Sequence, residues 1–414
     1  MGWSLAFTAL ALIAVAAVSR RLSGTPVTPA MVFVALGLLA GSLVVDAIDV
    51  ADTESAVRTL AEATLALVLF TDASRIRLRQ LERGARLPER LLGIGLPLTI
   101  ALGALVAGLV FDQLTVGEAL ILAVVLAPTD AALGQAVIGH PRVPQDVRQG
   151  LNVESGLNDG ICVPLLFAAV AFADVESDLS GGHSAFVLLI EEIGWGAVGG
   201  VAAGLLIAAV LRYAGGRGLI TEPWRQVVPA AGAALAYGTA VALGGSGFIA
   251  AFVAGATFRL ALGRDPEPLN RLAEEVGDVL NGVTFALFGA VLLGPALPEL
   301  DGSIALYAVL SLTLVRMLPV AIALLGTGAR RATVGFVGWF GPRGLASIVF
   351  AVIVVEESAL PHEDVIVTTV YCTVGLSVLV HGLTAAPLAD RYARPGPAPA
   401  RGSDPPATGS SWSA

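Results

Sequence analysis

The feature that most constrains this chain is a series of thirteen apolar runs, each of a length that crosses a lipid bilayer as a helix. A spanning helix needs roughly 17–25 predominantly apolar residues. Lipid offers the backbone no hydrogen-bond partners, so the pattern predicts an all-α polytopic membrane protein with 13 transmembrane helices. Its 14% charged residues also lie well below the roughly 25% of soluble domains. The runs lie near 3–19, 26–45, 57–73, 91–111, 116–138, 149–173, 184–211, 224–243, 246–262, 278–298, 303–326, 332–355 and 365–388.

The arginines predict how the chain is oriented in the membrane. All 24 basic residues are arginine, and 21 of them lie in the tail or in the segments that follow odd-numbered runs. Because cytoplasmic loops are enriched in basic residues, we expect the N-terminus outside and the C-terminus in the cytoplasm. Arg20 and Arg21 follow the first run, which is the wrong polarity for a cleaved signal, so this run is expected to be a transmembrane helix. The tail, 394–414, is rich in Pro, Gly, Ala and Ser and is expected to be disordered.

Two of the runs contain helix breakers near their middle. The breakers lie in Ala127-Pro128-Thr129-Asp130 of the fifth run and Gly341-Pro342-Arg343-Gly344 of the twelfth. Pro128 and Pro342 have nearly the same separation as the starts of the first and eighth runs. We therefore predict two inverted six-helix repeats, runs 1–6 and 8–13, with broken helices 5 and 12 that cross. Interrupted helices at corresponding positions indicate the binding site of a transporter.

Five charged side chains beside the motifs lie well inside apolar runs: Asp130, Glu154, Asp159, Arg316 and Arg343. A charge near the bilayer centre costs roughly 2.5–3.5 kcal/mol on insertion scales, so each is expected to have a partner or a function. We predict that Arg316 pairs with Glu154, and that Arg343 pairs with Asp130 where the broken helices meet. Asp130 and Arg343 could also neutralise half-helix dipole ends. Among these five, Asp159 is then the acid without a permanent cation.

The sharpest motif surrounds this acid, in the run Glu154-Ser155-Gly156-Leu157-Asn158-Asp159-Gly160. Helical spacing puts Glu154 and Asn158 on one face, and Ser155 and Asp159 on the neighbouring one. Hard cations take oxygen ligands, which Asp159, Ser155 and Thr129 supply together with carbonyls freed at the first break. Asp159 can then hold a proton or a cation, but not both. Asn158 is expected to orient its neighbours, and Glu154 to act chiefly as half of a scaffold ion pair.

These motifs make the chain resemble the monovalent cation:proton antiporter-1 family, the NhaP-type Na⁺/H⁺ antiporters of bacteria and archaea. The resemblance covers nearly the whole chain, and includes Arg316 with Pro319 besides the three motifs quoted above. It implies a secondary transporter rather than an enzyme, in the cell inner (plasma) membrane. It also implies a homodimer with a transmembrane domain at 1–393, in which helices 1–3 and 7–10 form the dimer interface. Helices 4–6 and 11–13 would form the moving, ion-transporting core.

The resemblance also implies a function and an ion site. The cation is expected at Asp159, Glu154, Ser155 and the Thr129 backbone, with access alternating between the two sides. Relatives with the Asn-Asp pair exchange one cation for one proton, so electroneutral Na⁺ or Li⁺ exchange that serves pH homeostasis is expected. One departure is Ala131, where many members have proline, so the first break is expected to be shaped differently.

Other functions remain open at this point. A K⁺/H⁺ antiporter would use the same oxygens, and a passive cation channel or a bile-acid-type symporter would share the membrane setting. Gly244-Gly245-Ser246-Gly247 also fits the motif of an intramembrane serine protease. No cofactor, structural metal or nucleic-acid partner is expected, because the four histidines are scattered and the two cysteines lie in apolar runs. Three polar residues near cytoplasmic helix ends are expected only to cap helices or line an entry funnel: Asp72, Asp278 and Asn281.

Overall fold

The computed structural model describes residues 2–22, 25–44, 50–75, 86–176, 182–263, 266–357 and 360–393. Every regular element within these ranges is helical, as the sequence predicted. The tail at 394–414 lies outside the described residues. The elements are α1 (Gly2–Leu22), α2 (Pro29–Val44), α3 (Val50–Arg75), α5 (Arg86–Arg90), η2 (Leu91–Gly95), α6 (Leu96–Val110), α7 (Val116–Val125), α8 (Gln135–Ile138), α9 (Gln145–Glu176), α10 (Gly182–Gly216), α11 (Glu222–Ala242), α12 (Gly247–Leu262), α13 (Glu267–Leu287), η3 (Phe288–Leu293), α14 (Gly294–Ala296), η4 (Leu297–Glu299), α15 (Gly302–Leu312), α16 (Leu314–Ala323), α17 (Arg331–Trp339), α18 (Leu345–Glu357) and α19 (Glu363–Tyr392).

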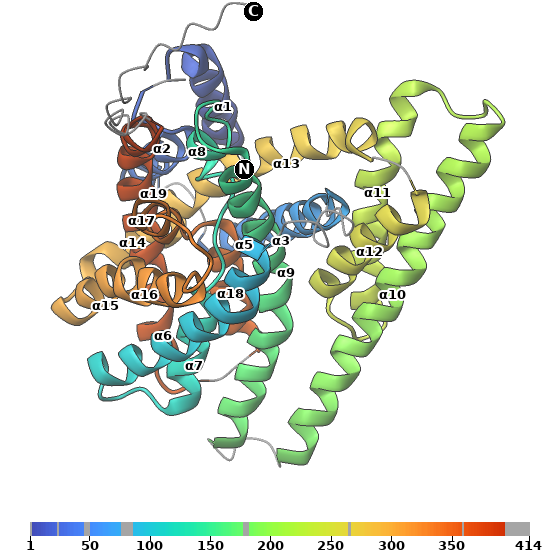
Figure 1. Ribbon diagram of the computed structural model, residues 1–414. Coiled ribbons are helices and arrows are strands. Elements are labelled where there is room, and N and C mark those ends of the chain that lie inside the picture. Colours follow the sequence, from blue (N-terminus) through green and yellow to red (C-terminus); the bar gives the residue numbers. More distant parts are fainter. Residues whose placement is uncertain are drawn as a thin grey trace, which may run out of the picture.

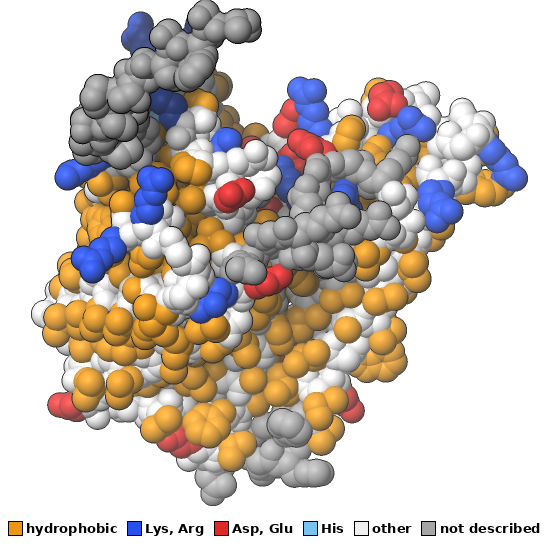
Figure 2. Space-filling model, in the orientation of Figure 1, with side chains coloured by type: hydrophobic (Ala, Val, Ile, Leu, Met, Phe, Trp, Pro, Cys, Tyr) orange, Lys and Arg blue, Asp and Glu red, His pale blue; other side chains and the backbone are white. Residues whose placement is uncertain are grey.

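Several of these helices have the length and composition of membrane spans. Six such segments occur in the described residues: Leu87–Val110, Gln145–Glu176, Leu189–Gly216, Glu267–Glu299, Gly302–Ala323 and Glu363–Tyr392. Shorter apolar helices, α7 and α18 among them, lie beside these long ones. The surface in Figure 2 shows a broad apolar belt, with arginine side chains gathered towards the upper end of this face. These features are those of an integral multi-pass membrane protein, whereas the count of thirteen spans and the inverted repeat stay predictions.

The helices form two neighbouring groups. In Figure 1, α10, α11 and α12 stand on the right, and α13 runs from them towards the remaining helices. Glycines bring α10 and α12 into close backbone contact, because a Cβ atom at Gly200 or Gly204 would lie 2.6 Å from a carbonyl oxygen of α12. Small residues permit such close packing of membrane helices.

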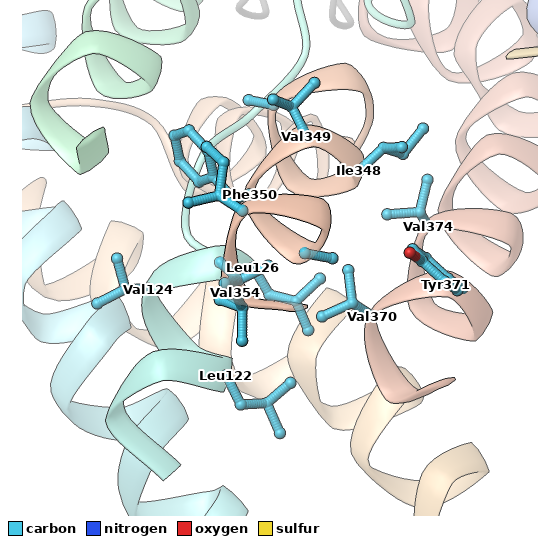
Figure 3. Close-up of a cluster of buried hydrophobic side chains, with 14 of the residues drawn as sticks. Leu122, Val124, Leu126, Ile348, Val349, Phe350, Val354, Val370, Tyr371 and Val374 are labelled. Carbon is cyan, nitrogen blue, oxygen red and sulfur yellow. The ribbon is translucent and has the colours of Figure 1, made fainter. Parts of the chain in front are cut away.

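A buried apolar cluster packs the ends of the two broken helices together. Leu122 and Leu126 lie at the end of α7, Phe350 and Val354 belong to α18, and Val370 belongs to α19 (Figure 3). All five side chains are buried. This cluster fixes α7 against α18 and α19, so it determines where the two breaks lie relative to each other.

Two apolar runs are less regular than predicted. The fifth was expected to be a broken span over 116–138; its helix does end at Val125, but it resumes only as the four-residue α8. The oxygen Oδ1 of Asp130 accepts hydrogen bonds from the amides of Ala132 and Leu133, at 2.7 and 3.1 Å, and this local turn competes with a helix. The run at 303–326 is also interrupted, at Thr313 between α15 and α16. The sequence carried no proline or glycine at that point.

Candidate functional site

The site forms where the two breaks meet beside α9. At the first break, the backbone N–H of Asp130 donates to the carbonyl oxygen of Pro342, across 2.7 Å. At the second, α17 ends at Trp339 and α18 begins at Leu345. The breaks predicted from the two motifs are therefore present, and they are bonded directly to each other.

The charged side chain of each break binds backbone groups of the other break. Oδ2 of Asp130 accepts from the N–H of Leu345, the first residue of α18, at 2.9 Å. Nη1 of Arg343 donates to the carbonyl oxygens of Ala127 and Pro128, just beyond the end of α7. Each side chain thus binds backbone groups that the other helix leaves without a helical partner.

The ion pair predicted between Asp130 and Arg343 is therefore wrong. No salt bridge joins these two side chains in the part of the chain that the structure describes. The other predicted role, the neutralisation of half-helix ends, is confirmed. The negative end of α7 attracts the guanidinium, and the positive end of α18 attracts the carboxylate. The side chain of Arg343 is fully buried, and Asp130 is only 9% exposed.

The ion pair predicted between Arg316 and Glu154 is present. Two N–H groups of Arg316 donate to the two carboxylate oxygens, at 2.5 and 3.0 Å, which is the bidentate geometry typical of strong arginine–carboxylate pairs. Both side chains are at most 6% exposed. Gly341 of the second break makes room for this pair, because a Cβ atom there would collide with the guanidinium.

Asp159 is a buried acid that takes part in neither of these two arrangements. It lies on α9 with 7% exposure, and its Oδ1 atom has no hydrogen-bond partner among the described residues. Nearby, the hydroxyls of Thr129 and Ser155 are 2.9 Å apart, and Nδ2 of Asn158 donates to Oγ1 of Thr129 at 2.8 Å. The side-chain carbonyl oxygen of Asn158 is likewise buried without a partner. Buried polar groups without partners carry a desolvation cost, so these oxygens could hold a cation or, on the carboxylate, a proton.

Comparison with known proteins identifies the family. The family model of the transmembrane sodium/hydrogen exchangers matches residues 7–391. The chain belongs to this family. The fold agrees, since the chain superimposes on the sodium proton antiporter MjNhaP1 from Methanocaldococcus jannaschii with a TM-score of 0.71, covering 92% of this chain and 98% of that one at 19% identity.

Curated relatives also support an NhaP-type antiporter. The chain is 27% identical over 395 residues to the K(+)/H(+) antiporter NhaP2 of Shewanella oneidensis. It is 25% identical over 246 residues to a probable Na(+)/H(+) antiporter of Schizosaccharomyces pombe. The alignments cover 92% and 56% of this chain, and 65% and 32% of those relatives. The chain therefore spans only part of the length of these relatives.

The structure adds a fourth acid, Asp72, which the sequence had placed at a helix end. Asp72 of α3 packs against Gly156, where an added Cβ atom would lie 3.1 Å from the Cβ atom of Asp72. Gly156 lies between Ser155 and Asp159 on α9, so the carboxylate of Asp72 faces the same turn of helix. The sequence did show an acid near the end of an apolar run. It did not show which other helix that acid would face.

A second addition is a pair of polar residues on α19. The hydroxyl of Ser377 accepts from the backbone N–H of Arg343, at 2.7 Å, and lies 3.1 Å from Nδ1 of His381. Nε2 of His381 donates to the carbonyl oxygen of Trp339, at 3.0 Å. The two side chains therefore hold both ends of the second break. In the sequence they were only polar residues one turn apart within an apolar run.

The serine protease motif has a structural explanation. Oγ of Ser246 accepts from the backbone N–H of Ile249 at 3.3 Å, so the residue is the N-cap of α12. Its side chain is 4% exposed. The described residues also contain no cluster of three or more metal-binding side chains.

Proposed function

We propose that the chain exchanges a monovalent cation for a proton across the cell membrane, at one site centred on Asp159. The observation that carries this proposal is the buried carboxylate oxygen without a partner, next to two hydroxyls at the first helix break. The family gives independent support, because its members are sodium/hydrogen exchangers. The cation would be bound by Asp159 with Ser155 and Thr129, close to Glu154.

The charge pattern supports electroneutral exchange. Arg316 neutralises Glu154, while Asp130 and Arg343 carry opposite charges and serve the two half-helix ends. Asp130 accepts three N–H donors on its two carboxylate oxygens, and these bonds favour its charged form over the protonated one. Asp72, the further acid beside α9, has Arg75 as a neighbour at 3.8 Å, so Asp159 is the acid of the site left to exchange a proton for a cation. One proton or one Na⁺ or Li⁺ ion at a time gives 1:1 exchange without net charge.

We further propose alternating access by displacement of a core, in a homodimer. Helices α1–α3 and α10–α13 would form the dimer interface, and α6–α9 with α15–α19 would form the moving core in residues 1–393. Support comes from the position of Asp159 on α9, beside both broken helices. The second candidate ion is K⁺, which is favoured by the K(+)/H(+) antiporters among the relatives.

The test is cation-driven proton efflux from proteoliposomes, with Na⁺, Li⁺ and K⁺ compared and with and without an imposed membrane potential. We expect exchange that the potential does not accelerate, and loss of exchange in Asp159→Asn with the protein still folded. Asp301→Asn is the matched control, because Asp301 is an N-cap, and asparagine caps helices as well as aspartate does. Exchange retained in Asp159→Asn would disprove the site, and acceleration by the potential would disprove the 1:1 stoichiometry.

A further inference from the structure

A pocket lies away from the ion site, at the cytoplasmic end by the predicted orientation. It has a volume of about 770 Å³ and lies between α17, the end of α19 and the segment that leads into α9. We call it the α17–α19 pocket. Three arginines line it, one from each of these segments: Arg142, Arg330 and Arg391.

The wall of this pocket is aromatic and ordered. The ring of Phe336 stacks on that of Tyr392, with centroids 4.2 Å apart, and lies 4.7 Å from that of Phe340. The hydroxyl groups of Tyr392 and Thr333 are 2.9 Å apart, which ties α19 to α17. Apolar rings with hydroxyls at their edge suit an amphiphilic molecule that has a polar head.

The charges of the lining favour an anion. Arg142 is 3.3 Å from Asp390, but neither Arg330 nor Arg391 forms an ion pair among the described residues. Asp146 is the one acidic side chain in the lining. Guanidinium groups bind phosphate oxygens through two parallel hydrogen bonds, so two arginines without acidic partners form a suitable site for a phosphodiester.

An apolar ridge leads from the pocket along the membrane-spanning part of α19. Leu379 is 49% exposed and Leu383 is 44% exposed, and Pro387 is also exposed. These residues and Arg391 are four positions apart in turn, which is the spacing of a surface ridge on a helix. An acyl chain that follows the two leucines would bring its headgroup to Arg391. A soluble anion would leave this ridge unused.

We propose that the α17–α19 pocket binds the headgroup of an anionic phospholipid whose acyl chains lie along the exposed ridge of α19. Basic pockets between membrane helices are a known type of site for such headgroups. The pocket wall belongs to α17, which leads directly into the second break. A bound lipid would thus steady the helix that positions Arg343.

Native mass spectrometry of the full chain, with equal amounts of phosphatidylglycerol and phosphatidylcholine, tests this proposal without measuring transport. We expect wild type to retain phosphatidylglycerol preferentially. Arg330→Gln with Arg391→Gln should lower this retention about 25-fold, because each basic side chain near an anionic lipid strengthens binding about fivefold. Arg217→Gln with Arg271→Gln is the matched control, since both arginines lie outside the pocket, and it should retain the lipid as wild type does. Arg330→Lys with Arg391→Lys should keep most of the retention.

Several results would overturn the proposal. One is equal retention by wild type and the pocket variant, with both folded as judged by thermal unfolding. Another is an equal loss in the control variant, which would mean that only the total charge matters. Displacement of the lipid by excess inorganic phosphate would identify a free anion as the ligand. Deletion of residues 394–414 should leave retention unchanged, and a large increase would instead make the tail the occupant of the pocket.

Discussion

The two broken helices are built differently, although each has a proline and a charged residue at its break. After the first break, the chain forms a turn around Asp130 and then only the short α8. After the second, the 13-residue helix α18 begins at once. The first break is therefore an irregular loop that exposes polar groups to the ion site. The second is a short connection between two helices, from Phe340 to Gly344.

The difference assigns different tasks to the two charges. Asp130 shapes its own loop through two amides and reaches α18 through a third. Arg343 instead donates from its side chain to two carbonyl oxygens of the first break, so it connects the second break to the first. An acid just beyond the end of α7 would be unfavourable with that helix dipole alone. The guanidinium of Arg343 at the same carbonyls removes this cost.

The largest expected effect comes from removing the guanidinium of Arg343. Arg343→Ala leaves the carbonyl oxygens of Ala127 and Pro128 buried without their donor, and each such loss costs about 1–3 kcal/mol. We expect a severe loss of thermal stability in detergent. Asp130→Asn keeps the size and one acceptor oxygen, so it should cost less, about 1–3 kcal/mol. Thermal unfolding of purified protein measures both.

A variant with both substitutions tests whether Asp130 and Arg343 act together. Because the two side chains stabilise one crossing, their effects on unfolding should not add, with a coupling of about 0.5–3 kcal/mol. Glu222→Gln serves as the control, since Glu222 pairs with Arg225 on the exposed start of α11. Strict additivity of Asp130→Asn and Arg343→Ala would mean that the two breaks are stabilised independently.

A smaller effect is expected from closing the space between the breaks. In Gly344→Ala, the new Cβ atom would collide with the carboxylate of Asp130, whereas a Cβ atom at Gly335 of α17 would meet nothing within 4 Å. Overpacking of this kind costs about 1–3 kcal/mol. Gly335→Ala should instead be neutral or stabilising, since alanine favours a helix by about 1 kcal/mol over glycine. The prediction fails if the two variants unfold at the same temperature.

Much of the site could be predicted from the sequence, because charges inside apolar runs are few and costly. Arg316 and Glu154 had to find partners, and the motifs brought Asp159, Ser155 and Thr129 to one break. The pairing of Asp130 and Arg343 could not be predicted in the same way. Their real partners are backbone groups, which every residue has and no pattern marks.

The helical course was less predictable at three points. The turn after Asp130 depends on side-chain bonds to nearby amides that compete with the helix. The interruption at Thr313 has no proline or glycine to mark it; the hydroxyl of Thr313 donates to the carbonyl oxygen of Val309, a local bond that competes with the regular helix. The contact of Asp72 with Gly156 depends on how α3 packs against α9. Periodicity within one run says nothing about such contacts between runs.

The smallest expected effect tests the support of the second break by α19. Ser377→Ala removes the acceptor of the buried N–H of Arg343, and it leaves the bond between His381 and Trp339 in place. We expect a loss of about 1 kcal/mol, with cation/proton exchange reduced but present. Ser377→Thr keeps the hydroxyl and should restore most of the stability.

Thr384→Ala is a control one turn beyond His381, because its hydroxyl binds the Trp339 side chain rather than the break itself. If Ser377→Ala and Thr384→Ala reduce exchange equally, α19 supports α17 as a whole. A selective effect of Ser377→Ala would locate that support at the backbone N–H of Arg343. The second break would then depend on an acceptor from α19, whereas the first break supplies its own acceptor, Asp130.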